Sequence, residues 1–270
     1  TELIPTLSIP RLVPNLFPTI LHTYRIAIIG EAPGRDEEIQ GEPFVGMSGR
    51  LLNALLSKAG LVRQSLFFGN ICQLRPPNNK IEDFEWAGEE IQSGLKQLRE
   101  DLLVFKPNLC VLLCDKTAYA LRAFKGDAAS FTYWRGSLFL SPTFGYKSIA
   151  TYHPAAVLRQ YEWLQILALD LRRAAEEGQH SNIEPRDLHI CLPQNKDDYF
   201  DSVVVSLRTI RQARLTISVD IEGGINTMSC LSIATGPQDS FIIPFTATDN
   251  VSYWDEEQEI VVWEELSLTL

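Results

Sequence analysis

Four short apolar runs recur along the first part of the chain. They are RIAIIGE (25–31), SLFFGNICQ (65–73), NLCVLLCD (108–115) and KSIATYHP (147–154). Their apolar residues are consecutive rather than alternating, which is typical of parallel strands buried on both faces. The pattern therefore predicts four strands at the centre of a sheet.

Stretches with the helical spacing of apolar residues separate and follow these runs. They cover residues 48–60, 81–105, 115–124 and 163–178. Ser48 is placed to cap the first of them at its N-terminus, and Gly60 is placed to end it. Strands that alternate with helices favour a three-layer α/β/α sandwich with a central four-stranded parallel sheet. We predict this domain over residues 1–180.

Beyond residue 180 both the pattern and the charge change. Residues 181–270 contain a polar linker, a helical stretch over 199–214 and alternating runs at 215–224, 228–236 and 239–245, which predict an α+β unit with an antiparallel sheet. Residues 1–180 hold 19 basic and 19 acidic residues, whereas residues 181–270 hold 5 and 15, so the net charge of -10 belongs to the second part. Such a shift marks a domain boundary.

Composition narrows the class of protein. No apolar run reaches the ~18 residues of a membrane-spanning helix, and the N-terminus lacks the pattern of a signal peptide. We therefore expect a cytoplasmic protein without a membrane partner. The acidic net charge argues against a generic nucleic-acid binder. Most of the cysteines fall in apolar runs, which indicates buried thiols in a reducing compartment; the five are Cys72, Cys110, Cys114, Cys191 and Cys230.

Polar residues follow the predicted strands where an α/β protein places its site. Glu31 follows the first strand, Asn70 lies near the end of the second and His153 follows the fourth. Because the carboxyl ends of parallel strands share one edge of a sheet, these side chains are expected to meet there. The chemistry suits a pocket for one flipped-out base, with Phe44 stacking on the ring and Glu31 orienting a water.

The loop GEAPGRDEEIQGEPFVGMSGRLL (30–52) excludes two common phosphate sites. A Walker loop needs a Lys beside Ser or Thr after its last glycine, and this loop has none. A dinucleotide fingerprint needs three glycines at fixed spacing, and the acidic residues of this loop would repel a pyrophosphate. Its glycines instead allow the backbone to approach a flat ligand closely.

Three segments in the same order resemble the uracil-DNA glycosylase superfamily, and most closely its family 4 branch. They are GEAPGRDEEIQGEPFVGMSGRLL, FFGNICQLRPP and TYHPAAVLRQ, and the resemblance covers residues of about 25–175. Phage-encoded proteins related to DNA polymerases share this domain. The resemblance implies DNA containing uracil as the substrate, in a bacterial or phage-infected cell.

The resemblance also implies a role for each motif residue. His153 would donate a hydrogen bond to uracil O2, and Glu31 would position the water or stabilise the sugar cation. Asn70 would read the uracil edge, and Glu37 would crowd the place of a thymine methyl. The remaining substrate contacts would come from the loops and the last motif: Ala32, Gly34, Phe44 and Ser48 around the base and phosphates, and Val157, Leu158 and Arg159 in the gap left by the flipped base.

One feature of family 4 is missing from the sequence. Family 4 members hold an iron–sulfur cluster with four cysteines, but residues 1–24 contain none, and Leu74 occupies the third position. The fourth position, in the helical stretch after residue 80, is also without cysteine. We therefore predict no cluster and no other cofactor for this domain, with Trp86 or the N-terminal arm filling the space.

The second part resembles the start of another enzyme. ISVDIEGG (217–224) is similar to the first motif of the 3'-5' exonuclease domain of family A DNA polymerases, which has a ribonuclease H-like fold. Asp220 and Glu222 alternate on one predicted strand, so they face the same side and could hold Mg²⁺ or Mn²⁺. The later aspartates of such a site do not follow in the chain. We expect a partial domain, with the remainder of a polymerase or other replication proteins as partners.

Three functions remain open from the sequence. The first is a uracil-DNA glycosylase fused to an exonuclease fragment. The second is a module that binds DNA or senses uracil without releasing the base, which the neutral charge of the first part favours. The third is a metal-dependent nuclease that rests on Asp220 and Glu222.

Overall fold

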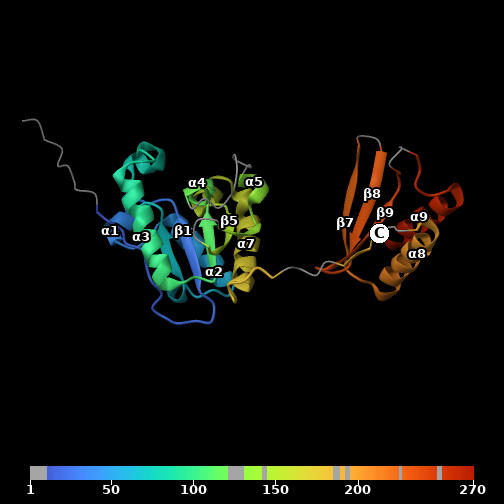
Figure 1. Ribbon diagram of the computed structural model, residues 1–270, viewed down its shortest axis with the longest axis horizontal. Coiled ribbons are helices and arrows are strands. Elements are labelled where there is room, and N and C mark those ends of the chain that lie inside the picture. Colours follow the sequence, from blue (N-terminus) through green and yellow to red (C-terminus); the bar gives the residue numbers. More distant parts are fainter. Residues whose placement is uncertain are drawn as a thin grey trace, which may run out of the picture. The chain divides into compact units, whose positions relative to one another are not determined.

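The computed structural model describes residues 11–120, 131–141, 145–184, 189–191, 195–224, 227–247 and 251–270. The chain divides into two compact units, Thr1–Ile183 and Glu184–Leu270 (Figure 1). The sequence placed the boundary at residue 180, close to this division. Residues 1–10 of the expected arm and 121–124 of the expected third helix lie outside the described residues.

A five-stranded sheet forms the centre of the first unit. Its strands are β1 (Ile26–Gly30), β2 (Phe67–Asn70), β3 (Leu109–Leu113), β4 (Leu138–Leu140) and β5 (Lys147–Thr151), in the order β2-β1-β3-β5-β4. The four predicted strands are parallel, and β4 adds an antiparallel edge beside β5. The prediction of a four-stranded sheet missed β4 because this strand has three residues and none of them is fully buried.

Helices cover both faces of this sheet, as the apolar strands require. One face packs against α2 (Met47–Lys58), α6 (Pro154–Arg159) and α7 (Leu164–Glu177), and the other against α3 (Glu89–Phe105) and α4 (Asp115–Ala120) (Figure 1). Successive strand residues point to opposite faces, so Ile28 lies in the first core and Ile29 in the second. Shorter elements are α1 (Arg35–Gln40), α5 (Phe131–Trp134) and the 3₁₀ turns Arg63–Ser65, Pro77–Asn79, Ile81–Asp83 and Tyr161–Trp163.

Two helix starts differ from the prediction. α2 begins at Met47 with Gly46 as its N-cap, so Ser48 lies inside the first turn and does not cap the helix. α3 begins at Glu89 rather than near residue 81, because a 3₁₀ turn and Gly88 interrupt the helical stretch. Glycine is the least favourable helix former after proline, and Gly88 serves here as the N-cap.

The N-terminal arm packs on the sheet edge beside β2. Leu16 pairs with Phe68 as an isolated antiparallel bridge, and the Val13 N–H donates to the carbonyl oxygen of Gln73 at 2.9 Å. Val13 is buried at 1% exposure, whereas Trp86 is 36% exposed. The described part of the arm, rather than Trp86, therefore covers this edge.

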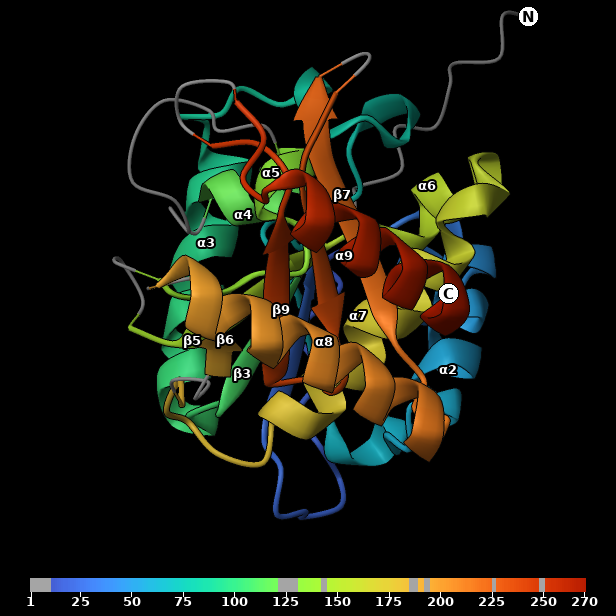
Figure 2. The ribbon, with the colours of Figure 1, turned by 90° about the vertical axis from the view of Figure 1, so that its right-hand side faces the viewer.

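The second unit consists of one sheet with helices on one face. Its elements are β6 (His189–Cys191), α8 (Lys196–Ala213), β7 (Ser218–Gly224), β8 (Thr227–Ala234), β9 (Asp239–Pro244) and α9 (Glu256–Thr269). The strand order is β6-β9-β8-β7, with β6 parallel to β9 and the other pairs antiparallel. α8 and α9 lie side by side on the sheet, and their apolar residues share one core with β8 and β9 (Figure 2).

The prediction of buried thiols is correct for three of the cysteines. Cys72, Cys110 and Cys114 are buried, but Cys230 is half-buried and Cys191 is exposed. Cys191 ends the short edge strand β6, all of whose residues are exposed. An apolar run therefore did not guarantee burial at the edge of a sheet.

Candidate active site

A cleft with a volume of about 660 Å³ opens at the carboxyl ends of the parallel strands. It gathers all the site residues that the sequence placed in the first unit except Val157 and Leu158. These are Glu31, Ala32, Gly34, Glu37, Phe44, Ser48, Asn70, His153 and Arg159. They come from loops after β1, from the end of β2 and from the segment after β5, which are distant in the sequence but adjacent at this edge of the sheet.

Gly30 allows two walls of the cleft to approach each other. A Cβ atom at this position would lie 2.7 Å from both Asn70 Oδ1 and Phe44 Cζ. Phe44 is 5% exposed and adopts a φ of 57°, so the loop turns its ring inward, where its centroid lies 6.3 Å from that of the His153 ring. A phenyl ring and a carboxamide thus border the same small space, as recognition of a flat polar ring requires.

The backbone at the end of β2 fixes the position of Asn70 and its carboxamide. Asn70 is 4% exposed, and its backbone is fixed by the pairing of Gly30 with Asn70 and by a hydrogen bond from the Gln73 side chain to its carbonyl oxygen at 2.9 Å. Within the described part of the chain, no hydrogen bond engages the Asn70 side-chain amide. Buried amides are ordinarily paired, so this group is suited to a ligand.

His153 is a neutral hydrogen-bond donor at the N-terminus of α6. Its Nδ1 accepts the backbone N–H of Ala155 at 3.1 Å, so the ring proton belongs on Nε2. Burial, and then the positive charge of Arg159, lower the pKa of His153 to about 4. The imidazole therefore stays neutral at physiological pH and keeps one N–H for a ligand.

Glu37 ties together the two ends of the loop that carries Phe44. Its Oε1 accepts the N–H groups of Val45 at 3.0 Å and Gly46 at 2.7 Å, and its Oε2 accepts the N–H of Gly34 at 3.1 Å. The carboxylate also lies at the N-terminus of α2, where the helix dipole favours a negative charge. The expected role against a thymine methyl stays a prediction, but the structure gives Glu37 a second, structural role.

We expect Glu37→Gln to destabilise the first unit by about 1–3 kcal/mol. The amide NH₂ of glutamine would replace one carboxylate oxygen, so a backbone N–H would lose its acceptor and face a second donor. Urea unfolding followed by circular dichroism measures the effect. Asp36→Asn is the matched control, since Asp36 is exposed in the same helix and should change stability by only a few tenths of a kcal/mol. Equal midpoints for the two variants would contradict the structural role of Glu37.

The segment after β5 divides into a buried and an exposed part. Val157 is fully buried in the core against α2 and α7, so the expectation that it fills the gap in the duplex is wrong. Leu158 is 43% exposed and Arg159 is also exposed, so these two remain free to contact DNA. Burial changes between neighbouring residues here because α6 is a helix, in which successive residues point about 100° apart.

Several residues that the sequence did not single out also border the cleft. Cys114, Asp115 and Lys116 follow β3, and the Cys114 thiol lies 2.9 Å from a Glu31 oxygen. Tyr152 and Trp163 stack with ring centroids 4.3 Å apart. The position of Lys116 directly after a strand was a usable signal, because the carboxyl end of β3 lies at the same edge as that of β1.

The cysteines do not fit an iron–sulfur cluster, which ordinarily takes four cysteine thiolates. Cys72 donates its thiol to the carbonyl oxygen of Leu74, and Cys110 lies in the core between β3 and α3. Among the described residues, which include all five cysteines, the one group of three possible metal ligands is Glu31, Cys114 and Asp115.

In the second unit, Asp220 and Glu222 lie on β7, opposite Ser232 and Cys230 of β8. Both are exposed and two residues apart, so they share one face of the strand as expected. No group of three possible metal ligands includes them among the described residues. The predicted Mg²⁺ or Mn²⁺ site therefore lacks a third ligand in the part of the chain that the structure describes.

The fold and the cleft define an α/β protein that can hold a small planar ring between a phenyl ring, an amide, a carboxylate and a neutral imidazole. The sequence profile of the uracil DNA glycosylase superfamily matches residues 18–173, which is more than half of the chain. The chain therefore belongs to the uracil-DNA glycosylase superfamily.

Its curated relatives include several proteins named type-4 uracil-DNA glycosylase. The protein of Archaeoglobus fulgidus is 34% identical over 158 residues, which cover 56% of this chain and 75% of the relative. The protein of Thermotoga maritima is 35% identical over 153 residues, which cover 56% of this chain and 76% of the relative. The profile match ends before the second unit begins.

Proposed function

We propose that this chain is a uracil-DNA glycosylase that hydrolyses the bond between uracil and deoxyribose in DNA. The observation that carries the proposal is the convergence of Glu31, Asn70 and His153 with the Phe44 ring in one cleft. Membership of the superfamily and the resemblance to proteins named type-4 uracil-DNA glycosylase support it.

Base release generates two opposite charges, and the cleft offers a group for each. The leaving uracil gains negative charge on O2, and the Nε2–H of His153 would donate a hydrogen bond to it. The sugar gains positive charge at C1', and the Glu31 carboxylate would stabilise this charge or orient the attacking water. Because His153 is neutral, it would act as a hydrogen-bond donor rather than as a general acid.

Selection of uracil would depend on shape and on an amide. The Asn70 carboxamide has both a donor and an acceptor, which match N3–H and O4 of uracil. Phe44 would stack on the base, and its placement against Gly30 limits the depth of the pocket. Leu158 and Arg159, exposed on the segment after β5, would contact the DNA around the extracted nucleotide.

The experiment is to incubate the whole chain with a labelled oligonucleotide that contains one deoxyuridine, and then to treat it with alkali. We expect strand cleavage at the uracil, and we expect Glu31→Ala to lower the single-turnover rate by at least about 10²-fold. Glu162→Ala is the control, because Glu162 is exposed on a 3₁₀ turn.

Two other outcomes of this assay would contradict the proposed activity in different ways. Binding that prefers uracil without base release would make the chain a uracil-sensing module instead of an enzyme. An absence of both release and preference would leave a shared fold and overturn the proposed function.

For the second unit we propose an exonuclease-like fold, with a polymerase or other replication proteins as partners. Its antiparallel strands and the shared face of Asp220 and Glu222 support this. Calorimetric titration of the whole chain with Mn²⁺ tests the metal site, and binding that is lost in Asp220→Asn would support it. Among the described helices, none is long and apolar enough to cross a membrane.

A further inference from the structure

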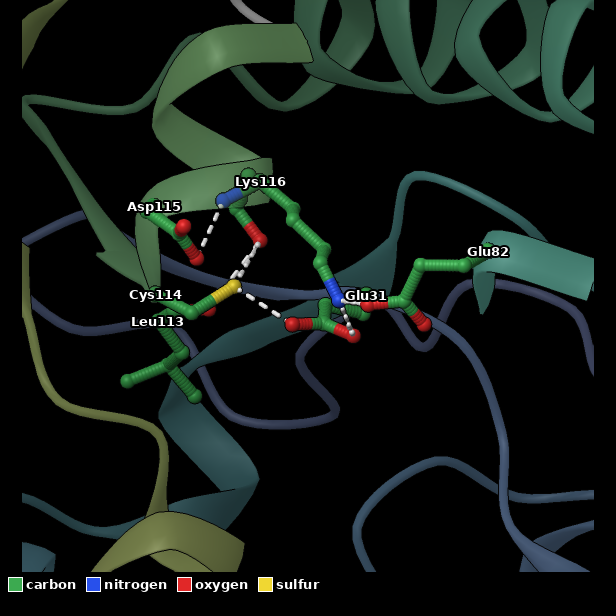
Figure 3. Close-up of polar contacts among 7 residues, drawn as sticks. Glu31, Glu82, Leu113, Cys114, Asp115 and Lys116 are labelled. Atoms are coloured by element: carbon green, nitrogen blue, oxygen red, sulfur yellow. Dashed lines mark hydrogen bonds and ion pairs between the residues drawn. The ribbon is translucent and has the colours of Figure 1, made fainter. Parts of the chain in front are cut away.

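We propose that Cys114 and Lys116 are positioning residues that hold the Glu31 carboxylate in one orientation. The proposal rests on the proposed function, because it assigns a purpose to residues beside the carboxylate of that site. Cys114 follows β3 and Lys116 lies in the first turn of α4, and both side chains point toward Glu31 (Figure 3).

The two residues engage different oxygens of the carboxylate. The Cys114 Sγ lies 2.9 Å from Glu31 Oε1, and the Lys116 Nζ lies 4.0 Å from Glu31 Oε2. A carboxylate held at both oxygens cannot rotate freely about its last side-chain bond. A fixed orientation matters here because Glu31 has to present one lone pair to the sugar or to the water.

The thiol proton is directed toward Glu31 by its surroundings. The Thr117 hydroxyl lies 3.3 Å from Sγ, but it has one proton and lies 3.0 Å from the Leu113 carbonyl oxygen, to which it donates. Thr117 is therefore not the donor in its contact with Cys114, and the ionised carboxylate is the stronger acceptor for the thiol. Burial, and then the charge of Glu31, raise the pKa of Cys114, so the sulfur keeps its proton.

The backbone of Cys114 is held in a conformation that side chains rarely adopt. Its φ is 93°, which strains the backbone of a non-glycine residue. The conformation is fixed because the Cys114 N–H donates to the carbonyl oxygen of Thr151 at 2.8 Å, at the end of the strand that precedes His153. Glycine would adopt this φ without strain, so the presence of a thiol here indicates that the side chain has a use.

Lys116 links Glu31 to a second carboxylate on the rim of the cleft. It forms an ion pair with Glu82, on the 3₁₀ turn Ile81–Asp83, as well as with Glu31 (Figure 3). Burial lowers the pKa of Lys116, but the hydrogen bond that Lys116 donates to Glu82 and the charge of Glu31 outweigh burial and raise this pKa. The Lys116 side chain therefore stays positively charged.

The experiment compares Cys114→Gly and Cys114→Ser in the whole chain by single-turnover release of uracil. Gly removes the thiol and also relieves the strained backbone, so the urea midpoint of unfolding should stay close to that of the wild type. The chemical rate should fall by about 10-fold or more, with substrate affinity unchanged. Ser restores a donor and should recover most of the rate.

The same comparison at Lys116 uses Lys116→Met and Lys116→Arg, and Arg should retain the rate that Met loses. Cys110→Ala is the control, because Cys110 is a buried thiol in the core that does not contact the cleft. Full activity of Cys114→Gly in an active wild type would overturn the proposal, and so would a loss that Ser does not reverse.

A second measurement tests the proposal independently of glycosylase activity. The infrared S–H stretch of Cys114 is isolated by subtracting the spectrum of Cys114→Ser from that of the wild type. A hydrogen bond to a carboxylate weakens the S–H bond, so the band should move to higher frequency in Glu31→Ala. An S–H band that does not move would overturn the proposed hydrogen bond from Cys114 to Glu31. If the wild type released no uracil, the proposed function would fail while the infrared result still decided the position of Glu31.

Discussion

His153→Ser should lower the single-turnover rate of uracil release by about 10²–10³-fold, the cost of removing one donor to a developing oxyanion. Serine is chosen because its hydroxyl accepts the Ala155 N–H as Nδ1 does now, and serine is a favoured N-cap. The variant should therefore keep α6 intact and lose only the Nε2–H. Thermal unfolding next to the rate assay separates these two effects.

The pH dependence of the same reaction tests the neutral state of the imidazole. Because its pKa is lowered to about 4, His153 stays neutral as pH falls from 8 to 5, and its titration should not reduce the rate in this range. Below about 4 the ring gains a proton on Nδ1 and loses its hydrogen bond from Ala155. A His153-dependent fall in rate centred near pH 6.5 would contradict the neutral ring. His189→Ser, in the second unit, is the control that should leave the rate unchanged.

Gly49→Ala should destabilise the first unit by about 2 kcal/mol or more, although the same change in an ordinary helix stabilises by about 1 kcal/mol. A Cβ atom at Gly49 would lie 2.1 Å from both the carbonyl carbon and the carbonyl oxygen of Phe44. These are backbone atoms and cannot rotate away, so either α2 or the loop must move. Because Phe44 borders the cleft, uracil release should also fall, by about 10²-fold if its ring shifts by 1 Å.

Urea unfolding and a rate assay at a temperature where the variant is folded measure both effects. Ser57→Ala is the matched control, because Ser57 is exposed in the same helix and alanine is a better helix former. It should be as stable as the wild type or slightly more so. A Gly49→Ala variant that matches Ser57→Ala in stability would show that α2 does not pack this closely on Phe44.

Much of the first unit could be predicted from local pattern. A run of consecutive apolar residues is enough to indicate a buried parallel strand, and the order of strands and helices restricts the topology. Once strands are parallel, their carboxyl ends share one edge, so Glu31, Asn70 and His153 could be grouped before any coordinates. The strands at the sheet edges were predicted least well. β4 has three residues, too few for an apolar pattern, and the apolar run at β6 indicated burial although all three of its residues are exposed.

The sequence by itself determined the layers of the fold, the edge where the cleft lies and the motif residues that border it, because these follow from periodicity and chain order. Only the tertiary structure decided how those residues are held. Glu31 and Cys114 are 83 positions apart and meet because β3 pairs with β1. The burial of Val157 and the exposure of Leu158 likewise depend on how α6 packs on its neighbours. Contacts of this kind arise from packing between distant segments, which no local pattern encodes.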